Sequence, residues 1–377
     1  MALAPLGPLT NVIWPAQAQK SEKSAADCAG KRFAGGKRGV GKAVLKVADR
    51  RLTGGLVKKA VIWGLVVAAG GGSSAMAQSL NPWGASVYTG ANLGKSRESF
   101  SGSTTGSVYV RGLTYASAFD VGAGLNVRSE VVYSGILTGG IRAGGNVTLN
   151  GGSISGGVAS GGSLKATSGS TVVNGGAILR GTNQAGSRVT VNGGVTTGAA
   201  YSSAIDFAAM EQAYRSASGL AAGLGPNAVA ILNGSTLTLS SNGAGTNIYQ
   251  VTAAQLAAAQ NVVVTGGVGS TAVLNVSGDA VNIATSSWSF FGGASASTTL
   301  INAMGAFSVN ASGTLGATIL APDALVRLTN TQVHGSVFSY GLVGSGNLDG
   351  GFMGVVPAPG AFALLSVGGL VAMRRRR

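Results

Sequence analysis

Short apolar runs separated by Gly-Gly or Asn-Gly pairs fill the chain from about residue 106 to residue 200. In Gly144–Gly152, Val147 and Leu149 alternate with polar residues, and Val189–Gly194 repeats this arrangement. Alternation with a period of two, with turn residues between the runs, predicts many short β-strands. We therefore expect a mainly β fold, namely a β-solenoid that resembles a parallel β-helix. A β-sandwich is the competing interpretation, because periodicity alone does not separate the two.

The spacing of apolar residues becomes helical at 203–225. The recurring residues are Phe207, Met210, Tyr214, Ala217, Leu220 and Leu224. Ser203–Asp206 is typical of a helix start, and Gly225 followed by Pro226 is typical of a stop. We expect one long amphipathic helix over about residues 204–223, packed alongside the β-body. A shorter helix is expected over Thr252–Ala259, because Thr252 and Gln255 have the spacing of a capping box.

Alternating apolar runs resume after the long helix and predict further strands. These are Ser235–Leu239, Asn247–Val251, Asn261–Val264, Ala272–Val276, Thr299–Ile301, Ala317–Leu320 and Gln332–Val337. We expect them to continue the same β domain, which we place at residues 78–350.

The formal net charge of +15 comes mostly from the two ends of the 377-residue chain. Residues 1–59 hold 12 Lys or Arg against three acidic residues, and the last four residues are all Arg. Positions 60–373 are therefore left with 10 basic and 8 acidic residues. This distribution argues against the nucleic-acid partner that a uniformly basic chain would suggest. Cys28 is the only cysteine, so the domain has no disulfide framework.

Residues 58–77 have the three parts of a secretory signal peptide. Two lysines precede the apolar run Ala60–Ala69, and small residues follow it. The apolar run is shorter than the roughly 20 residues that span a bilayer. The expected cleavage-site residues are Ala75, Ala77 and Gln78. Export through Sec-type machinery is the partner interaction that follows from this signal.

Residues 1–57 form a basic, Gly- and Ala-rich extension ahead of the signal. One interpretation is a long, disordered N-terminal region of the signal peptide. The interpretation we favour is that translation starts later, at a codon other than Met between Leu52 and Val57, so that the extension is not translated.

The last segment, residues 356–377, combines a Pro-rich motif, an apolar stretch at 360–373 and a cluster of arginines. Basic residues after an apolar stretch tend to stay in the cytoplasm. The segment resembles the PEP-CTERM sorting signal, which implies transient insertion in the inner membrane and processing by an exosortase-type transpeptidase. Ala358 departs from the family pattern, which has Glu at this position, and implies a variant sorting enzyme. The sorting residues carried over are Pro357, Ala358, Pro359, Arg374, Arg375, Arg376 and Arg377.

The domain between the two ends resembles the choice-of-anchor A family. The resemblance rests on Ala204–Ala209, Asn247–Thr252, Ala272–Gly278, Gly316–Val326 and Thr331–Val337. That family shares one surface domain among different C-terminal anchors, and its name implies no molecular activity. The layout of β-repeats beside one long helix is also similar to the ice-binding β-solenoids, which we adopt as the fold analogy.

The candidate chemistry in this domain is sparse. His334 is the lone histidine and lies in a Val-His-Gly turn, where we expect a structural or solvent-facing role. None of the acidic residues forms a D-x-D or E-x-x-E pair; they are Glu98, Asp120, Glu130, Asp206, Glu211, Asp279, Asp323 and Asp349. We therefore expect no catalytic residue, no metal site and no cofactor.

Two further patterns have ordinary structural explanations. Thr236 and Thr238 form one outward pair at strand spacing. Ice binding needs a flat face with an ordered array of Thr or similar residues, so we interpret this pair as ordinary surface residues of a strand. Trp288, Phe290 and Phe291 form the only dense aromatic group, for which core packing is favoured over stacking on sugars.

These patterns together predict a non-enzymatic structural or adhesive protein of the cell surface or extracellular matrix. Extracellular polysaccharide is the partner that the sorting-signal resemblance implies. The alternatives from other classes are an ice-binding or carbohydrate-binding β-solenoid and, last, a polysaccharide-active enzyme.

Overall fold

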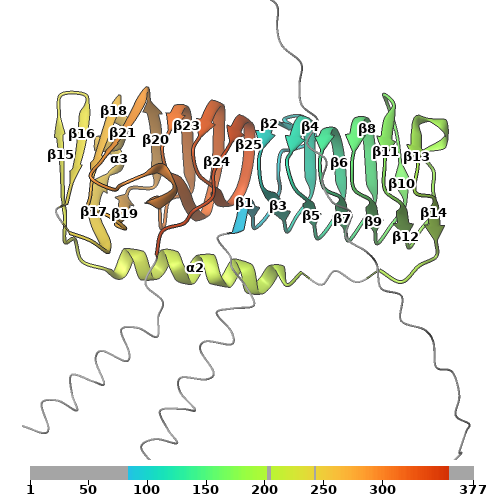
Figure 1. The fold of residues 1–377 in the computed structure, drawn as a ribbon, viewed down its shortest axis with the longest axis horizontal. Helices are drawn as coiled ribbons and strands as arrows, with labels where there is room; N and C mark the ends of the chain where they lie inside the picture. Colours follow the sequence, from blue (N-terminus) through green and yellow to red (C-terminus); the bar gives the residue numbers. More distant parts are fainter. Residues whose placement is uncertain (1–83, 202–204, 242, 356–377) are drawn as a thin grey trace, which may run out of the picture. The chain divides into compact units, whose positions relative to one another are not determined.

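The computed structural model describes residues 84–355, except 202–204 and 242. The described chain is mainly β, and its strands coil so that each turn lies parallel on the turn before it (Figure 1). A β-sandwich, the competing interpretation, consists of antiparallel sheets, so the parallel pairing of successive turns does not fit it. The segments expected to be a signal peptide, 58–77, and a sorting tail, 356–377, lie outside the described residues.

The first half of the domain, which we call the N-terminal coil, has strands of two to eight residues. Its strands are β1 (Ala85–Thr89), β2 (Phe100–Thr104), β3 (Ser107–Val110), β4 (Thr114–Val121), β5 (Leu125–Val127), β6 (Val131–Leu137), β7 (Ile141–Ala143), β8 (Val147–Ile154), β9 (Val158–Ser160), β10 (Leu164–Lys165), β11 (Thr171–Val173), β12 (Ala177–Leu179), β13 (Val189–Val191) and β14 (Val195–Thr197). Strands two apart in sequence pair with each other, as β3 does with β5 and β4 with β6.

Helix α2 (Phe207–Gly223) then connects the N-terminal coil to the C-terminal coil, which starts at the opposite end of the stack (Figure 1). The elements of the C-terminal coil are β15 (Val229–Asn233), β16 (Thr236–Ser240), β17 (Thr246–Thr252), α3 (Ala253–Ala258), β18 (Asn261–Thr265), β19 (Thr271–Ser277), β20 (Ala280–Thr285), β21 (Ser287–Phe291), β22 (Thr299–Asn302), β23 (Ser308–Leu315), β24 (Thr318–Val333) and β25 (Val337–Leu348). Strands β15 and β16 form the antiparallel pair at this end.

The two coils join in the middle of the stack, where the last strand meets the first two. Strand β25 pairs in parallel with β1 and β2, with Phe338 beside Tyr88 and Leu348 beside Thr104. The chain thus begins the stack at its centre, winds outward, crosses on α2 and winds back. Val355, the last described residue, lies against the C-terminal coil, where its N–H donates to Thr271 Oγ1 at 2.9 Å and its carbonyl accepts from Thr246 Oγ1 at 3.1 Å.

The core of the coil comes from the period-two pattern of the strands. In β7 and β12 the outer two of three residues are buried and the central residue is exposed, so Val, Leu, Ile and Ala side chains fill the interior. Neighbouring strands stack too closely for a side chain at some of the bends within them. A Cβ on Gly152, whose φ is +108°, would lie 2.0 Å from the carbonyl oxygen of Gly135. Glycine is needed there both for its conformation and for its lack of a side chain.

The helix expectations hold with small shifts. Helix α2 begins at Phe207 instead of near 204, because Asp206 is the N-cap and accepts from the N–H groups of Ala208 and Ala209. The capping box of Thr252 and Gln255 is present at α3. Ser203 lies outside the described residues.

The largest difference from the expected strands is in the last part of the coil. Strand β24 extends over 16 residues to Val333, and β25 begins at Val337. The single strand predicted over Gln332–Val337 is therefore two strand ends around a corner that contains His334.

Candidate functional site

One ladder of strands runs along the whole stack, and α2 packs on the part of it from β17 to β1. We call it the helix-side ladder; in spatial order its strands are β17, β19, β22, the first parts of β24 and β25, and then β1, β3, β5, β7, β9, β12 and β14. The register gives it one continuous outward row, which we call the central row: Asn275, Asn302, Leu320, Phe338, Tyr88, Tyr109, Asn126, Arg142, Ala159, Ile178 and Thr196.

Aromatic packing and ion pairs fix the start of α2 over the junction of the two coils. Tyr214 stacks on Phe338 with ring centroids 4.5 Å apart and lies 4.8 Å from the ring of Tyr88. Burial raises the pKa of both tyrosines, with Tyr214 only 1% exposed. The hydroxyl of Tyr88 donates to the carbonyl oxygen of Phe207 at 3.1 Å.

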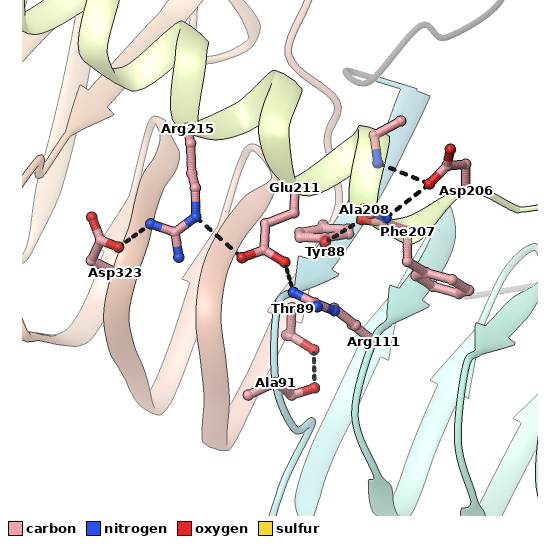
Figure 2. A network of polar contacts seen from close by, with 11 residues as sticks. Tyr88, Thr89, Ala91, Arg111, Asp206, Phe207, Ala208, Glu211, Arg215 and Asp323 are labelled. Atoms are coloured by element: carbon pink, nitrogen blue, oxygen red, sulfur yellow. Dashed lines mark hydrogen bonds and ion pairs between the residues drawn. The ribbon is translucent and has the colours of Figure 1, made fainter.

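Figure 2 shows how Glu211 of α2 links the two coils. Its carboxylate pairs with Arg111, which follows β3, and with Arg215 one helical turn later at 3.1 Å. Arg215 also pairs with Asp323 in β24, and this hydrogen bond is the main reason that the pKa of Arg215 is raised. The network holds the helix to both coils at once.

Two buried asparagines of the central row are satisfied by α2. The Asn302 amide donates to the Ser218 carbonyl at 3.0 Å and to Asn275 Oδ1 at 2.9 Å, and its oxygen accepts from Ser218 Oγ at 2.6 Å. Asn275 donates in turn to the carbonyl of Ala221 at 2.6 Å. The side chains of Asn302 and Asn275 are thus buried, at 1% and 5% exposure, with partners for both.

From Tyr109 on, the central row forms the floor of a groove of about 510 Å³. Tyr109 itself is partly buried against the apolar cluster under the start of α2. Outward side chains of five successive strands line it, from Tyr109 in β3 to Ile178 in β12. Bare backbone forms part of the lining: a Cβ on Gly140 would lie 2.6 Å from the carbonyl oxygen of Gly157. Ile205, just before α2, also lines the groove.

Asn126 is the unusual residue of this groove. It is only 8% exposed, yet its side chain has no hydrogen-bond partner within 84–355, leaving aside the four residues not described there. Its neighbours Leu125 and Val127 are core residues, so the amide points outward into the groove. Arg142, its register partner on β7, is exposed and forms no ion pair with a described residue.

The two coils carry opposite net charges. Residues 84–201 contain eight Lys or Arg and three Asp or Glu, a formal +5, whereas residues 205–355 contain two and five, a formal −3. The groove lies on the basic coil, and no acidic residue lines it.

Most acidic residues of the domain have structural partners. Glu98 pairs with Arg327, Asp120 accepts from the Ile136 N–H at 2.8 Å, and Glu130 accepts from Asn146 at 2.9 Å. Across the described ranges, no three of His, Cys, Asp and Glu lie close enough together to hold a metal ion. The three acidic side chains named here thus hold segments of the coil together.

His334 has a partner that the sequence did not reveal. Its Nδ1 lies 2.9 Å from Asp349 Oδ1, and Gln332 donates to the other carboxylate oxygen of Asp349 at 2.7 Å. This carboxylate could orient the imidazole, but no described hydroxyl or thiol hydrogen-bonds to the ring. The pair is 43% and 39% exposed and lies at the corner between β24 and β25.

The expected aromatic cluster is only half-buried. Trp288 and Phe290 lie with centroids 6.2 Å apart and pack against the core, while Phe291 is 56% exposed. Trp288 Nε1 donates to Thr285 Oγ1 at 3.0 Å, which fixes the indole on the coil. Core packing thus accounts for two of the three residues.

All of the predicted site residues lie outside the described residues, namely Ala75, Ala77, Gln78, Pro357, Ala358, Pro359 and Arg374–Arg377. In the part of the chain that is described, no helix is long and apolar enough to cross a membrane. The sequence reasoning missed Tyr109, Asn126 and Arg142 as a group. Their spacing of 16 to 17 residues, one turn of the coil, was the signal that could have found them.

Searches among curated proteins and among solved structures found no match to this chain. A family model covers nearly the whole β-body, from the start of β1 to the end of β25, including both coils and α2. Its description is "Putative Ice-binding-like adhesive domain", and its match over residues 84–349 places the chain in this family of adhesive domains.

Proposed function

We propose that this chain is an exported, non-enzymatic adhesive or structural protein of the cell surface or extracellular matrix. The observation that carries the proposal is the match of residues 84–349 to an adhesive domain family, which covers the entire coil. The structural partners of Glu98, Asp120 and Glu211 within the described residues agree with it. An adhesive domain acts outside the cytoplasm, in keeping with the signal peptide expected at residues 58–77.

The proposal includes sorting at the C-terminus. Sec-type machinery exports the chain and removes residues up to Ala77; residues 360–373 then halt in the inner membrane, and an exosortase-type enzyme processes the motif Pro357–Pro359. Mass spectrometry of the surface form is the test, with an N-terminus at Gln78 and a C-terminus before Arg377 as the expected result. An intact C-terminus at Arg377 would contradict the processing step.

Surface attachment is tested by deleting residues 357–377 and fractionating the cells. We expect the deleted chain to appear in the medium, with loss of cell attachment to a polysaccharide-coated surface. A matched control replaces Arg374–Arg377 by four lysines, which keeps the positive charge after the apolar stretch and should keep sorting. Unchanged attachment by cells that lack the whole chain would contradict the adhesive function.

The parallel coil with one long helix supports a β-solenoid similar to the ice-binding ones. Ice binding itself is the less favoured function, because the outward row of β16, β18 and β21 is mixed: Thr238 lies beside Val263, and Val263 beside Ser289. A thermal hysteresis assay of the purified chain separates the two functions. Extracellular polysaccharide is the partner class that we propose for adhesion.

A further inference from the structure

The central row contains three outward asparagines that are buried to a similar degree, and only one of them has no partner. Asn275, Asn302 and Asn126 are 5%, 1% and 8% exposed. The first two bond to α2 and to each other, whereas the side chain of Asn126 has no hydrogen bond to a described residue. The amide atoms of Asn126 are not among the fully buried, unpartnered side-chain atoms of the described chain, so they open onto the groove and its solvent. A ligand in the groove would bond to this amide in place of water.

The next residue of the row indicates the charge of that ligand. Arg142 lies beside Asn126 on the adjacent strand, about 4.8 Å away along the ladder. It has no acidic partner among the described residues, and the coil around it carries a formal +5. We therefore expect an anionic ligand. A planar guanidinium donates two parallel hydrogen bonds to a carboxylate, so a carboxylate is the anion that Arg142 suits best.

The shape of the groove favours a glycan over a peptide. An extended peptide binds by pairing with a free strand edge, but strands β5, β7 and β9 are each paired on both sides. The groove instead presents a row of side chains to a ligand. Tyr109, Asn126 and Arg142 follow one another in this row, on β3, β5 and β7. From β3 to β12 it extends about 19 Å, which accommodates several sugar units in line.

We propose that this groove binds an acidic glycan. A uronate carboxylate pairs with Arg142, sugar hydroxyls bond to the Asn126 amide, and one sugar ring lies against Tyr109. The assignment rests on the proposed adhesive function and specifies both the site and the chemical class of the polysaccharide.

The test is the affinity of the purified full-length chain for polygalacturonate, measured by isothermal titration calorimetry beside fully methyl-esterified polygalacturonate. Arg142→Gln should weaken binding roughly tenfold, since a charge-assisted hydrogen bond is lost. Arg180→Gln is the matched control: Arg180 is an exposed arginine of the same coil that does not line the groove, and its replacement should change affinity less than about twofold.

Asn126→Leu separates binding from folding. Because the amide has no partner in the free protein, its loss should leave the free energy of unfolding unchanged or raise it, while affinity for polygalacturonate falls several-fold. A lower stability without a change in affinity would assign Asn126 to the fold and overturn the proposal.

Three other results would also overturn it: no binding of polygalacturonate, equal binding of the methyl ester, or equal losses from Arg142→Gln and Arg180→Gln. The adhesive function is judged separately, by attachment of cells with and without the chain. Attachment that depends on the chain but is unchanged by Arg142→Gln would leave the adhesive function standing and refute the groove assignment.

Discussion

The buried side-chain amide of Asn302 joins α2 to the C-terminal coil, and replacing Asn302 tests how much this contact stabilises the fold. Asn302→Ala deletes a side chain that makes three hydrogen bonds with Ser218 and Asn275. The change leaves Ser218 Oγ and Asn275 Oδ1 buried, each without that partner. Each such group costs about 1–3 kcal/mol, so we expect a loss of about 3–4 kcal/mol in the free energy of unfolding.

The matched control is Asn310→Ala. Asn310 also donates to an asparagine on the neighbouring strand, Asn282, at 3.0 Å, but this pair is exposed to solvent. Water replaces an exposed hydrogen bond, so the expected loss is below about 0.5 kcal/mol. The identical substitution at two strand positions thus isolates the effect of burial under α2.

Urea unfolding followed by circular dichroism measures both variants. The difference in free energy follows from the shift in midpoint, provided that the slope with denaturant is unchanged. Losses of equal size in the two variants, or a loss below about 1 kcal/mol for Asn302→Ala, would refute the role assigned to the buried amides.

Three further predictions concern the helix, a bend within strand β6 and a buried hydroxyl. Gly219→Ala, in α2 where a Cβ would meet nothing within 4 Å, should raise the free energy of unfolding by about 0.5–1 kcal/mol in urea titration. Gly135→Ala, at φ +140° with the Phe119 carbonyl oxygen 2.3 Å from the added Cβ, should lower it by more than about 3 kcal/mol or prevent folding; an unchanged midpoint would contradict the close stacking. Burial raises the pKa of Tyr133, so the folded hydroxyl stays protonated above pH 10 while the unfolded one ionises. Stability should therefore fall above about pH 10 by about 1.4 kcal/mol per pH unit for this group, and Tyr133→Phe should remove that part of the slope in unfolding measured from pH 9 to pH 11.5.

Local patterns in the sequence were sufficient to predict the helices and many strands. Asp206, with apolar residues at helical spacing after it, gives the start of α2 within a few residues, and Thr252 with Gln255 gives α3. Both signals act within one turn of backbone, where side-chain caps and periodicity decide the structure.

The order of the turns in space could not be predicted in the same way. The pairing of β25 with β1 joins residues about 250 positions apart, and no local pattern encodes it. The groove depends on that order, because α2 must cover the central row up to Tyr88 and leave Asn126 and Arg142 uncovered. Asn126 in sequence is one polar residue in a short strand; its burial without a partner follows only from the register of five strands.

The attachment of Val355 to Thr246 and Thr271 determines how far the groove would stand from an anchored tail. From β19, which begins at Thr271, to β7, which carries Arg142, the helix-side ladder has seven strand-to-strand steps, or about 34 Å at about 4.8 Å per step. Electrostatic screening in physiological salt acts over about 8 Å. The end of the described chain and Arg142 are thus about four screening lengths apart, so a charge at one of them has little effect at the other.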